Sequence, residues 1–306
     1  MSSLPLEVMT GAVVGGTAIL YAAVGESFTE SAGVVNLGTE GSMLVGALAG
    51  YAVAAETGNP WAGALAGLVA GGLLALVHAW LVLARGANQL ANGLVVLFLG
   101  LGLTSLFGAD YVSVESSPFT TWDVPGLSSI PWLGEILFQH DPLTYLSFLL
   151  VPTAWWVLYR SRLGLMIRGV GERKEVLATY GHPVNLVQYG AVVVGGALAG
   201  VGGAQLSNAY ANAWFENMTV GRGFVACAVV IFAARQPFKV AAGAYLFGAA
   251  LALSPALQAR GYGINQFALN AIPYLLIIAV LVALGRRRAA EAPEGLQQVF
   301  EISPST

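Results

Sequence analysis

Charged residues are scarce in this chain of 306 residues: only 9% are Asp, Glu, Lys or Arg, and the formal net charge is -3. Without a strong positive field the chain offers no surface for nucleic acid, and we expect no such partner. Cysteine is nearly absent as well. Cys227 is the only one, which excludes an intrachain disulfide and a cysteine metal site, and within "GFVACAVVIFAA" it is expected to be a small packing residue.

The sequence also lacks the motifs of nucleotide binding and of covalent chemistry. No G-x-x-x-x-G-K-[ST] occurs, so the chain cannot bind ATP through a P-loop. His78, His140 and His182 have no spacing typical of a metal site, and His78 is expected to hydrogen-bond to a neighbouring helix. We therefore expect a protein that is not an enzyme and that holds no cofactor or metal itself.

What the chain has in abundance is apolar and small residues. Hydrophobic residues make up 57% of it, 39 residues are glycine, and the mean hydropathy is +0.72. This combination is typical of a membrane protein whose helices approach closely at small residues. The first segment has no basic residues before its apolar run, so it predicts a membrane helix and not a cleaved signal peptide. The predicted fold class is an all-α polytopic membrane protein.

Nine apolar segments are long enough, or nearly so, to cross a bilayer. They are residues 8–25, 42–55, 61–84, 89–108, 142–159, 185–207, 220–234, 240–257 and 266–285. Two of them, 42–55 and 220–234, are short for a hydrocarbon layer of about 30 Å. Each follows a polar stretch that contains glycine, so we predict broken helices at both places.

The distribution of basic residues predicts the orientation. If nine crossings alternate, one side receives nearly all of them: Arg85, Arg160, Arg162, Arg168, Arg173, Lys174, Arg235, Lys239, Arg286, Arg287 and Arg288. The positive-inside rule makes that side cytoplasmic. The connection 109–141 has acidic residues and no Lys or Arg, as expected of an extracytoplasmic loop. We predict an external N-terminus, a membrane domain over 1–288 and a mobile cytoplasmic tail over 289–306.

The predicted cytoplasmic loop 160–184 contains an unusual cluster of charge, Glu172, Arg173, Lys174 and Glu175. The pattern predicts a short helix from Glu172 to Gly181, with acidic residues in its first turn and a glycine near its end. The apolar side of so short a helix cannot be buried by the helix alone. Two interpretations remain open: a docking surface for another polypeptide, and a solvated loop whose charges fix the orientation.

Four stretches together carry a family resemblance. They are "ESAGVVNLGTEGSMLVGALAGYAVA" (31–54 region), "GANQLANGLVVLFLGLGLTSL" (86–106), "GLMIRGVGERKEVLATYGHPVNLVQYGAVVVGGALAGVGGA" (164–204) and "TVGRGFVACAVVIFAARQPFKVAAGAYLFGAALAL" (219–253). Over roughly residues 30–285 the chain resembles the permeases of ABC importers in the branched-chain amino acid, ribose and nucleoside superfamily. Within it, the chain is most similar to the shorter permease of the simple-sugar and purine-nucleoside group.

The resemblance implies a set of partners and a location. They are an ATP-binding cassette ATPase that carries ATP and Mg, a second and longer permease, an extracytoplasmic substrate-binding protein, and the lipid of a prokaryotic inner membrane. It also makes the charged loop a coupling helix that docks on the ATPase, with the candidate residues Glu172, Arg173, Lys174, Glu175, Leu177, Ala178, Tyr180 and Gly181. The chain departs from the family pattern at His182-Pro183 and at Gln236-Pro237.

Polar residues within apolar segments are the candidates for a translocation pathway: Asn36, Glu40, Asn88, Asn92, Asn208, Tyr210, Trp214 and Phe215. Amides and aromatic rings suit a neutral ring-bearing solute, but each can equally stabilise a broken helix, bridge two helices or form an interfacial belt. Two local expectations accompany them. Ser27 and Glu30 have capping-box spacing, which predicts a helix start, and Arg222 is expected to pair with Glu216.

These observations predict the permease subunit of an importer, with a nucleoside as the first expected cargo and a simple sugar as the second. A vitamin or a branched-chain amino acid would follow. Two rivals remain. An ion-coupled secondary transporter would need a buried acid, for which Glu40 is the candidate. A passive facilitator or scaffold would leave the charged loop unexplained.

Overall fold

The computed structural model describes residues 3–261, 265–288 and 293–296 and is built almost entirely of helices. The first half contains α1 (Leu4–Ser31), α2 (Thr39–Thr57), α3 (Pro60–Ala79) with the π-helical turn η1 (Trp80–Ala84), and α4 (Gln89–Gly108) with η2 (Ala109–Tyr111). The second half contains α6 (Pro142–Arg160), α7 (Arg162–Thr179), α8 (Val184–Gln205) with η3 (Leu206–Tyr210), α9 (Arg222–Phe232), α10 (Pro237–Ala259) and α11 (Gln266–Arg288). The predicted all-α polytopic class is confirmed.

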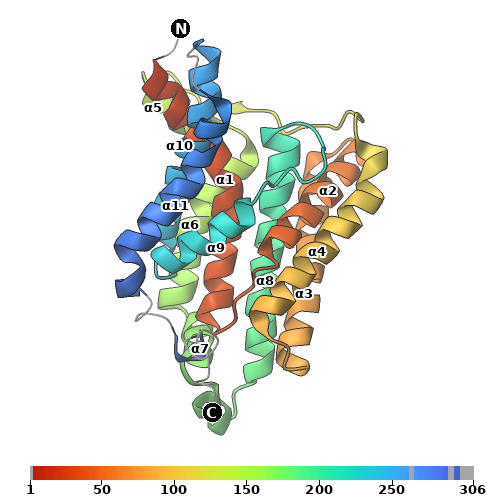
Figure 1. Cartoon of the computed structure of the whole chain (residues 1–306), viewed down its shortest axis with the longest axis vertical. Helices are drawn as coiled ribbons and strands as arrows, with labels where there is room; N and C mark the ends of the chain where they lie inside the picture. Colours follow the sequence, from red (N-terminus) through yellow and green to blue (C-terminus); the bar gives the residue numbers. More distant parts are fainter. Residues whose placement is uncertain (1–2, 262–264, 289–292, 297–306) are drawn as a thin grey trace.

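Between α4 and α6 the chain forms a compact cap at one end of the molecule. It contains the short helix α5 (Leu133–Leu137) and two strands of two residues each, β1 (Trp122–Asp123) and β2 (Gln139–His140), paired antiparallel. The N-terminus and α5 lie at one end of the bundle, and α7 lies at the other (Figure 1). We call the latter the α7 end.

Six helices of the described residues are long and apolar enough to cross a membrane. They are α1, α3 with η1, α4 with η2, α6, α8 with η3, and α10. The helix α9 is much shorter, at 11 residues, in agreement with the broken helix predicted near 220–234. The helix α2 is unbroken over its 19 residues, Thr39–Thr57, so the broken helix predicted at 42–55 is wrong. It starts only after the irregular stretch 32–38 that follows α1.

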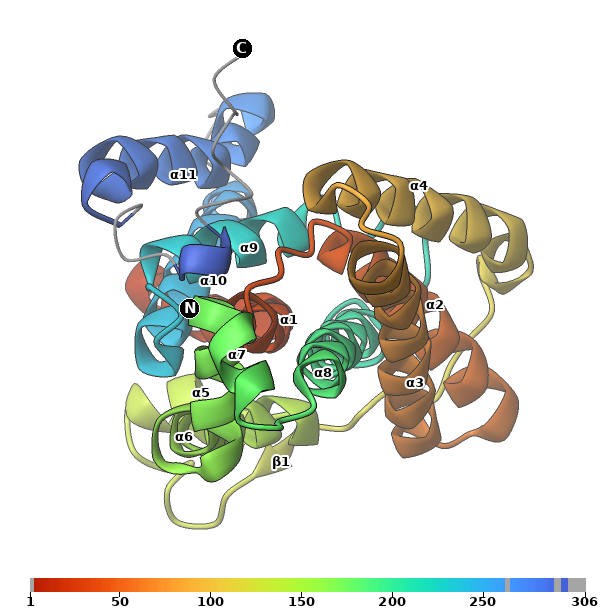
Figure 2. The same ribbon diagram turned by 90° about the horizontal axis from the view of Figure 1, so that it is seen from below.

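The helix α8 lies at the centre of the bundle, packed against α1 on one side and α3 on the other (Figure 2). Glycine makes this possible. A Cβ added at Gly200 would overlap the backbone carbonyl of Gly67 on α3, and a Cβ added at Gly46 on α2 would overlap Gly200 Cα. Three helices therefore meet at backbone contact, the arrangement that small residues permit in membranes.

The helix start expected from Ser27 and Glu30 is wrong. Both residues lie within α1, which continues for 28 residues, and the Ser27 hydroxyl donates to the Ala23 carbonyl one turn earlier at 2.8 Å. A serine bonded back to its own helix does not cap a new one.

Candidate functional site

The starts of the two helices that were predicted to be broken meet at Glu40. Its carboxylate is 3% exposed and lies in the first turn of α2. Its Oε1 accepts from the Thr219 hydroxyl at 2.6 Å and from the Gly221 amide at 2.8 Å, while Oε2 accepts from the Gly223 amide at the start of α9. The backbone donors that a helix start leaves free are thus satisfied by a carboxylate from another helix.

A second carboxylate holds the turn between α1 and α2. The Asn36 amide donates to Glu26 Oε1 at 2.9 Å, and the Thr39 hydroxyl lies 3.0 Å from Glu26 Oε2. The Asn36 side chain accepts from the Gly38 amide at 3.0 Å through Oδ1. Glu26 is a further residue of the site that was not among the predicted candidates, although its spacing of four residues from Glu30 on α1 places both on one face of the helix.

The two amides near the start of α4 have protein partners. Asn88 is the N-cap of α4 and accepts from the Ala91 amide at 3.0 Å. Asn92 donates to His78 Nδ1 at 2.9 Å, and His78 Nε2 lies 3.1 Å from the Val35 carbonyl. These partners assign the His78 proton to Nε2. His78 therefore links α3, α4 and the stretch 32–38, as expected for a histidine bonded to a neighbouring helix.

The four outer candidates differ in their surroundings. Trp214 is buried and donates through Nε1 to the Gly108 carbonyl at 2.9 Å, so it joins the end of α4 to the segment after η3. Asn208 is also buried, and its Oδ1 accepts from the Ser116 hydroxyl at 3.2 Å. Tyr210 and Phe215 are 40% and 47% exposed. The structure thus brings Asn208 and Trp214 into the packed interior and leaves the other two rings at the surface.

The ion pair expected between Arg222 and Glu216 is wrong. Glu216 instead accepts from the Ser105 hydroxyl on α4. The Arg222 guanidinium donates through Nη1 to the carbonyls of Met218 and Thr219 at 3.1 and 3.2 Å, and it lies 5.8 Å from the centre of the Tyr210 ring. Glu216 was predicted as the partner because it is close to Arg222 in sequence. The turn before α9 instead directs the Arg222 side chain toward the carbonyls of its own turn.

Five buried polar side chains keep an atom without a hydrogen-bond partner among the described residues: Glu30, Asn36, Ser42, Gln205 and Asn208. Both amide atoms of Gln205 are unpaired, and the whole residue is inaccessible. They lie on α1, α2, the stretch between them, and α8 with η3, which pack together. Buried polar groups normally have partners, so this group is a candidate pathway lining. Gln205 was missed because a single glutamine in an apolar helix gives no pattern.

The charged segment forms the second half of α7. At Arg173 the backbone leaves the helical region, with φ -147° and ψ 89°, so α7 is two helices joined at a kink. The helix predicted to start at Glu172 therefore starts after Arg173. We call residues 174–181 the arm. It ends at Gly181, whose φ of +77° is the left-handed conformation that favours glycine after a helix.

The arm is exposed along most of its length. Lys174, Glu175 and Ala178 are exposed, Val176 is 46% exposed and Tyr180 is 79% exposed, whereas Leu177 is half-buried beside Gly169. The first half of α7 is anchored instead: Gly171 is buried and touches the Ser31 carbonyl at the end of α1. The arm is thus an apolar and charged surface that extends from a fixed base.

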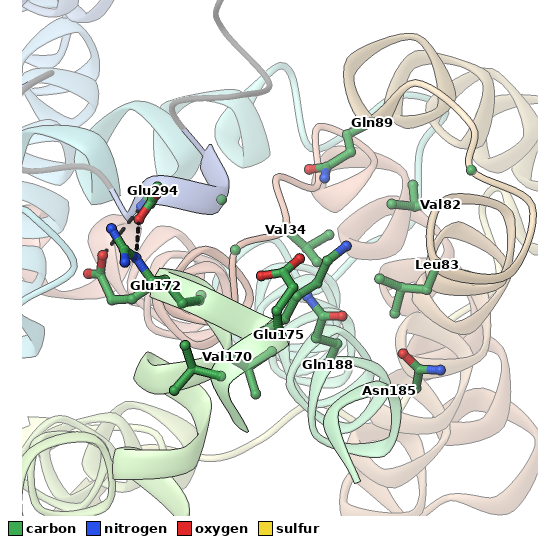
Figure 3. A pocket seen from close by; sticks show the side chains of 17 residues that line it. Val34, Val82, Leu83, Gln89, Val170, Glu172, Glu175, Asn185, Gln188 and Glu294 are labelled. Carbon is green, nitrogen blue, oxygen red and sulfur yellow. Dashed lines mark hydrogen bonds and ion pairs between the residues drawn. The ribbon is translucent and has the colours of Figure 1, made fainter. Parts of the chain in front are cut away.

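A cavity of about 750 Å³ opens beside the base of the arm. It is lined by the stretch after α1, by η1, by the starts of α4 and α8, and by α7 (Figure 3). Glu175 and Gln188 lie on its walls, as does Gln89, whose Oε1 accepts from the Val35 amide at 2.8 Å. The cavity therefore borders the stretch 32–38 at Gly33 and Val34.

The six long apolar helices of the described residues are those of a polytopic membrane protein. A family model described as "Branched-chain amino acid transport system / permease component" matches residues 8–284, so the chain belongs to this permease family. The resemblance found in the sequence is confirmed.

Several curated relatives match over nearly their whole length. A putative glucose ABC transporter permease of Haloferax volcanii is 42% identical, with 91% of this chain and 92% of the relative covered. A guanosine ABC transporter permease of Bacillus subtilis is 31% identical (90% and 91% covered), and a nucleoside ABC transporter permease of Lactococcus lactis is 28% identical (95% and 96%). The chain is an ABC permease of the sugar and nucleoside type, a multi-pass membrane component of a transporter.

Proposed function

We propose that this chain is the membrane subunit of an importer in a prokaryotic inner membrane, and that its α7 arm docks on a separate ATPase. The observation that carries the proposal is the exposure of Val176 and Tyr180 on a short helix with an anchored base. Isolated apolar groups of this kind are the anchors by which a helix fits a groove on a partner. In this proposal the separate ATPase binds ATP with Mg and hydrolyses the ATP.

The proposed orientation places the α7 end in the cytoplasm. Basic residues gather where helices meet that end: Arg85 follows η1, Arg160 ends α6, and Arg235 lies between α9 and α10. Cytoplasmic loops carry such an excess of Lys and Arg. The nine predicted crossings fit this orientation if α2, α9 and α11 are counted with the six long apolar helices, and the N-terminus is then external.

The base of the arm suggests how ATPase movement reaches the pathway. Gly171 touches the end of α1 at Ser31 and also the backbone of Gly33, two residues further on. A displacement of the arm would therefore move the stretch 32–38, which carries Asn36 and leads into α2 at Glu40. ATP binding would draw the arms of two permeases together and switch the pathway between its two sides. The second permease is proposed to be a related, longer chain.

The proposed pathway runs beside α1, α2 and α8, past the unpaired polar atoms of Asn36, Gln205 and Asn208. Buried amides without partners can bond a passing solute and its water without a fixed charge. Tyr210 and Phe215 would receive the solute at the outer end. Glu40, Asn88, Asn92 and Trp214 already have protein partners, and we propose that they hold the walls in place.

The proposed cargo is a neutral solute with a sugar ring, delivered by an extracytoplasmic binding protein. The relatives named for guanosine and nucleosides support a nucleoside, and the relative named for glucose supports a simple sugar. Both cargoes present hydroxyl groups to amides. Uptake of radiolabelled guanosine, cytidine, ribose and glucose into cells that carry the complete transporter would separate the two candidates.

The docking proposal is tested with a double substitution at the two ends of the arm region. Gly181→Asp with Glu172→Arg places a side chain at a left-handed position and reverses a charge at the base. Association with the ATPase and uptake should both fall at least tenfold while the permease remains in the membrane. Unchanged association and uptake would contradict the proposal. Glu135→Arg, at the opposite end on α5, is the control for a charge reversal.

A further inference from the structure

Four residues of the C-terminal tail, Pro293–Leu296, are packed against the base of the arm. Pro293 is buried and Leu296 is only 2% exposed. The rest of the predicted tail, 289–292 and 297–306, lies outside the described residues. The nearest described residue before it in sequence is Arg288, at the end of α11. The chain thus returns from α11 to a site made by α1 and α7.

Polar contacts fix the tail at the kink of α7. Arg173, the residue at which the helix breaks, donates through Nε to Glu294 Oε2 at 2.8 Å. The Glu294 amide donates to Glu172 Oε2 at 3.3 Å. Glu294 raises the pKa of Arg173, first through the hydrogen bond and then through its charge. Figure 3 shows Glu294 beside Glu172 at the edge of the cavity.

A backbone contact adds to the polar ones. A Cβ at Gly295 would lie 2.8 Å from the Gly171 carbonyl and 3.7 Å from Gly33 Cα. The tail therefore lies across the joint between α7 and the stretch after α1. Movement of α7 relative to the stretch after α1 must break the tail's contacts with one of them or displace the tail, because the tail contacts both.

The tail also separates two cavities. Glu294 and Gly295 line the cavity of about 750 Å³, and Pro293 lines a second of about 390 Å³ between α6, α7 and the segment after α9. The first cavity borders the stretch 32–38 at Gly33 and Val34. The tail thus covers part of the route by which a solute would leave at the α7 end.

We propose that residues Pro293–Leu296 form an autoinhibitory clasp, which locks the arm to the end of α1 and narrows the α7-end cavity until the arm is drawn away by the ATPase. The proposal rests on the proposed function of the arm. The exposure of the partners suits a reversible lock: the Arg173 and Glu294 side chains are 68% and 46% exposed, and solvated ion pairs of this kind are weak. Such an ion pair can stabilise the resting position of the arm and can break when the ATPase docks on the arm.

The test uses the complete transporter in proteoliposomes, with permeases, ATPase and binding protein. In a Glu172→Cys/Glu294→Cys variant, a short reducible bis-methanethiosulfonate reagent bridges the two positions. Each sample is its own control, measured before bridging, after bridging and after reduction. We expect the bridge to form, uptake to fall at least tenfold, and reduction to restore it. A bridge that does not form, or one that leaves uptake unchanged, would overturn the clasp.

Truncations provide a second measurement that does not depend on cysteine chemistry. Removal of residues 289–306 should raise ATP hydrolysis without solute at least threefold, whereas removal of 297–306 alone should leave it at the level of the full chain. Equal rates in the full chain and both truncations would also overturn the clasp. Failure of the unaltered transporter to take up any solute would instead count against the proposed function, which keeps the two proposals separate.

Discussion

The carboxylate of Glu40 lies 2.6 Å from the hydroxyl of Thr219, which is 179 residues further along the chain. This bond and the two amide bonds beside it join the start of α2 to the start of α9. Both oxygens of Glu40 are thus engaged by the protein. An ion-coupled transporter would need a carboxylate that exchanges its partners for an ion, and Glu40, the acid named for that rival, is held by three protein donors.

Replacing Glu40 should loosen the junction of the two helix starts. Glu40→Ala leaves three buried donors without an acceptor, and we expect the free energy of unfolding to fall by about 3 kcal/mol. Chemical unfolding in mixed micelles, followed by tryptophan fluorescence, measures the change. Glu216→Ala is the control, because Glu216 is exposed and its loss should change the same quantity by no more than about 0.5 kcal/mol. Equal stability of the two variants would contradict this account of Glu40.

The packing of α8 predicts a contrast between two glycines of one helix. Gly200→Ala places a methyl group in the backbone of α3 and should lower stability by roughly 1–3 kcal/mol. Gly190→Ala meets no atom of the described residues within 4 Å and should be neutral or slightly stabilising. Thermal stability in detergent, read by size-exclusion chromatography, compares them. The reverse order would show that the three helices do not meet at Gly200.

The bond between Asn92 and His78 predicts a structural effect without a change in solute affinity. Asn92→Leu leaves His78 Nδ1 unpaired and should cost about 1–3 kcal/mol, while the KM for uptake by the remaining protein stays within twofold. Asn88→Asp should keep the cap of α4 and change neither quantity, since aspartate caps as well as asparagine. A tenfold rise in KM with unchanged stability would place Asn92 in the pathway instead.

Gln205 should behave in the opposite way. Gln205→Leu removes buried polar atoms that have no partner among the described residues, so stability should hold or increase. Uptake should fall at least tenfold if the amide bonds the solute. Binding of the ATPase, measured by co-purification, should be unaffected. Full uptake by the variant would remove Gln205 from the proposed pathway.

The sequence predicted the all-α fold class because apolar runs and their glycines are local signals. The sequence also predicted a short charged helix after Gly171, because four neighbouring charges stand out in a chain with few charged residues. The predicted helix boundaries were wrong where contacts between residues distant in sequence determine the backbone conformation. The helix α1 continues through Ser27 because Glu26 finds its partners in the turn that follows.

For the same reason, contacts between residues far apart in sequence could not be predicted from local patterns. Arg222 was matched with Glu216 by proximity, whereas the fold gives Glu216 a serine on α4 and aims Arg222 at its own turn. The tail contact at Arg173 joins residues 121 positions apart and has no local signature. Local patterns thus give elements and candidate residues, and the packing of helices selects the partners.

The central claim is that this chain passes a solute through the membrane under the control of an ATPase bound at the α7 arm. The most direct test is to express it with the proteins encoded beside it, purify the assembly in detergent, and measure ATP hydrolysis with the binding protein and each candidate nucleoside or sugar. We predict a co-purifying ATPase whose turnover rises with one class of solute and which is lost from the Gly181→Asp/Glu172→Arg variant. A chain that purifies alone, or with partners that hydrolyse no ATP, would contradict it.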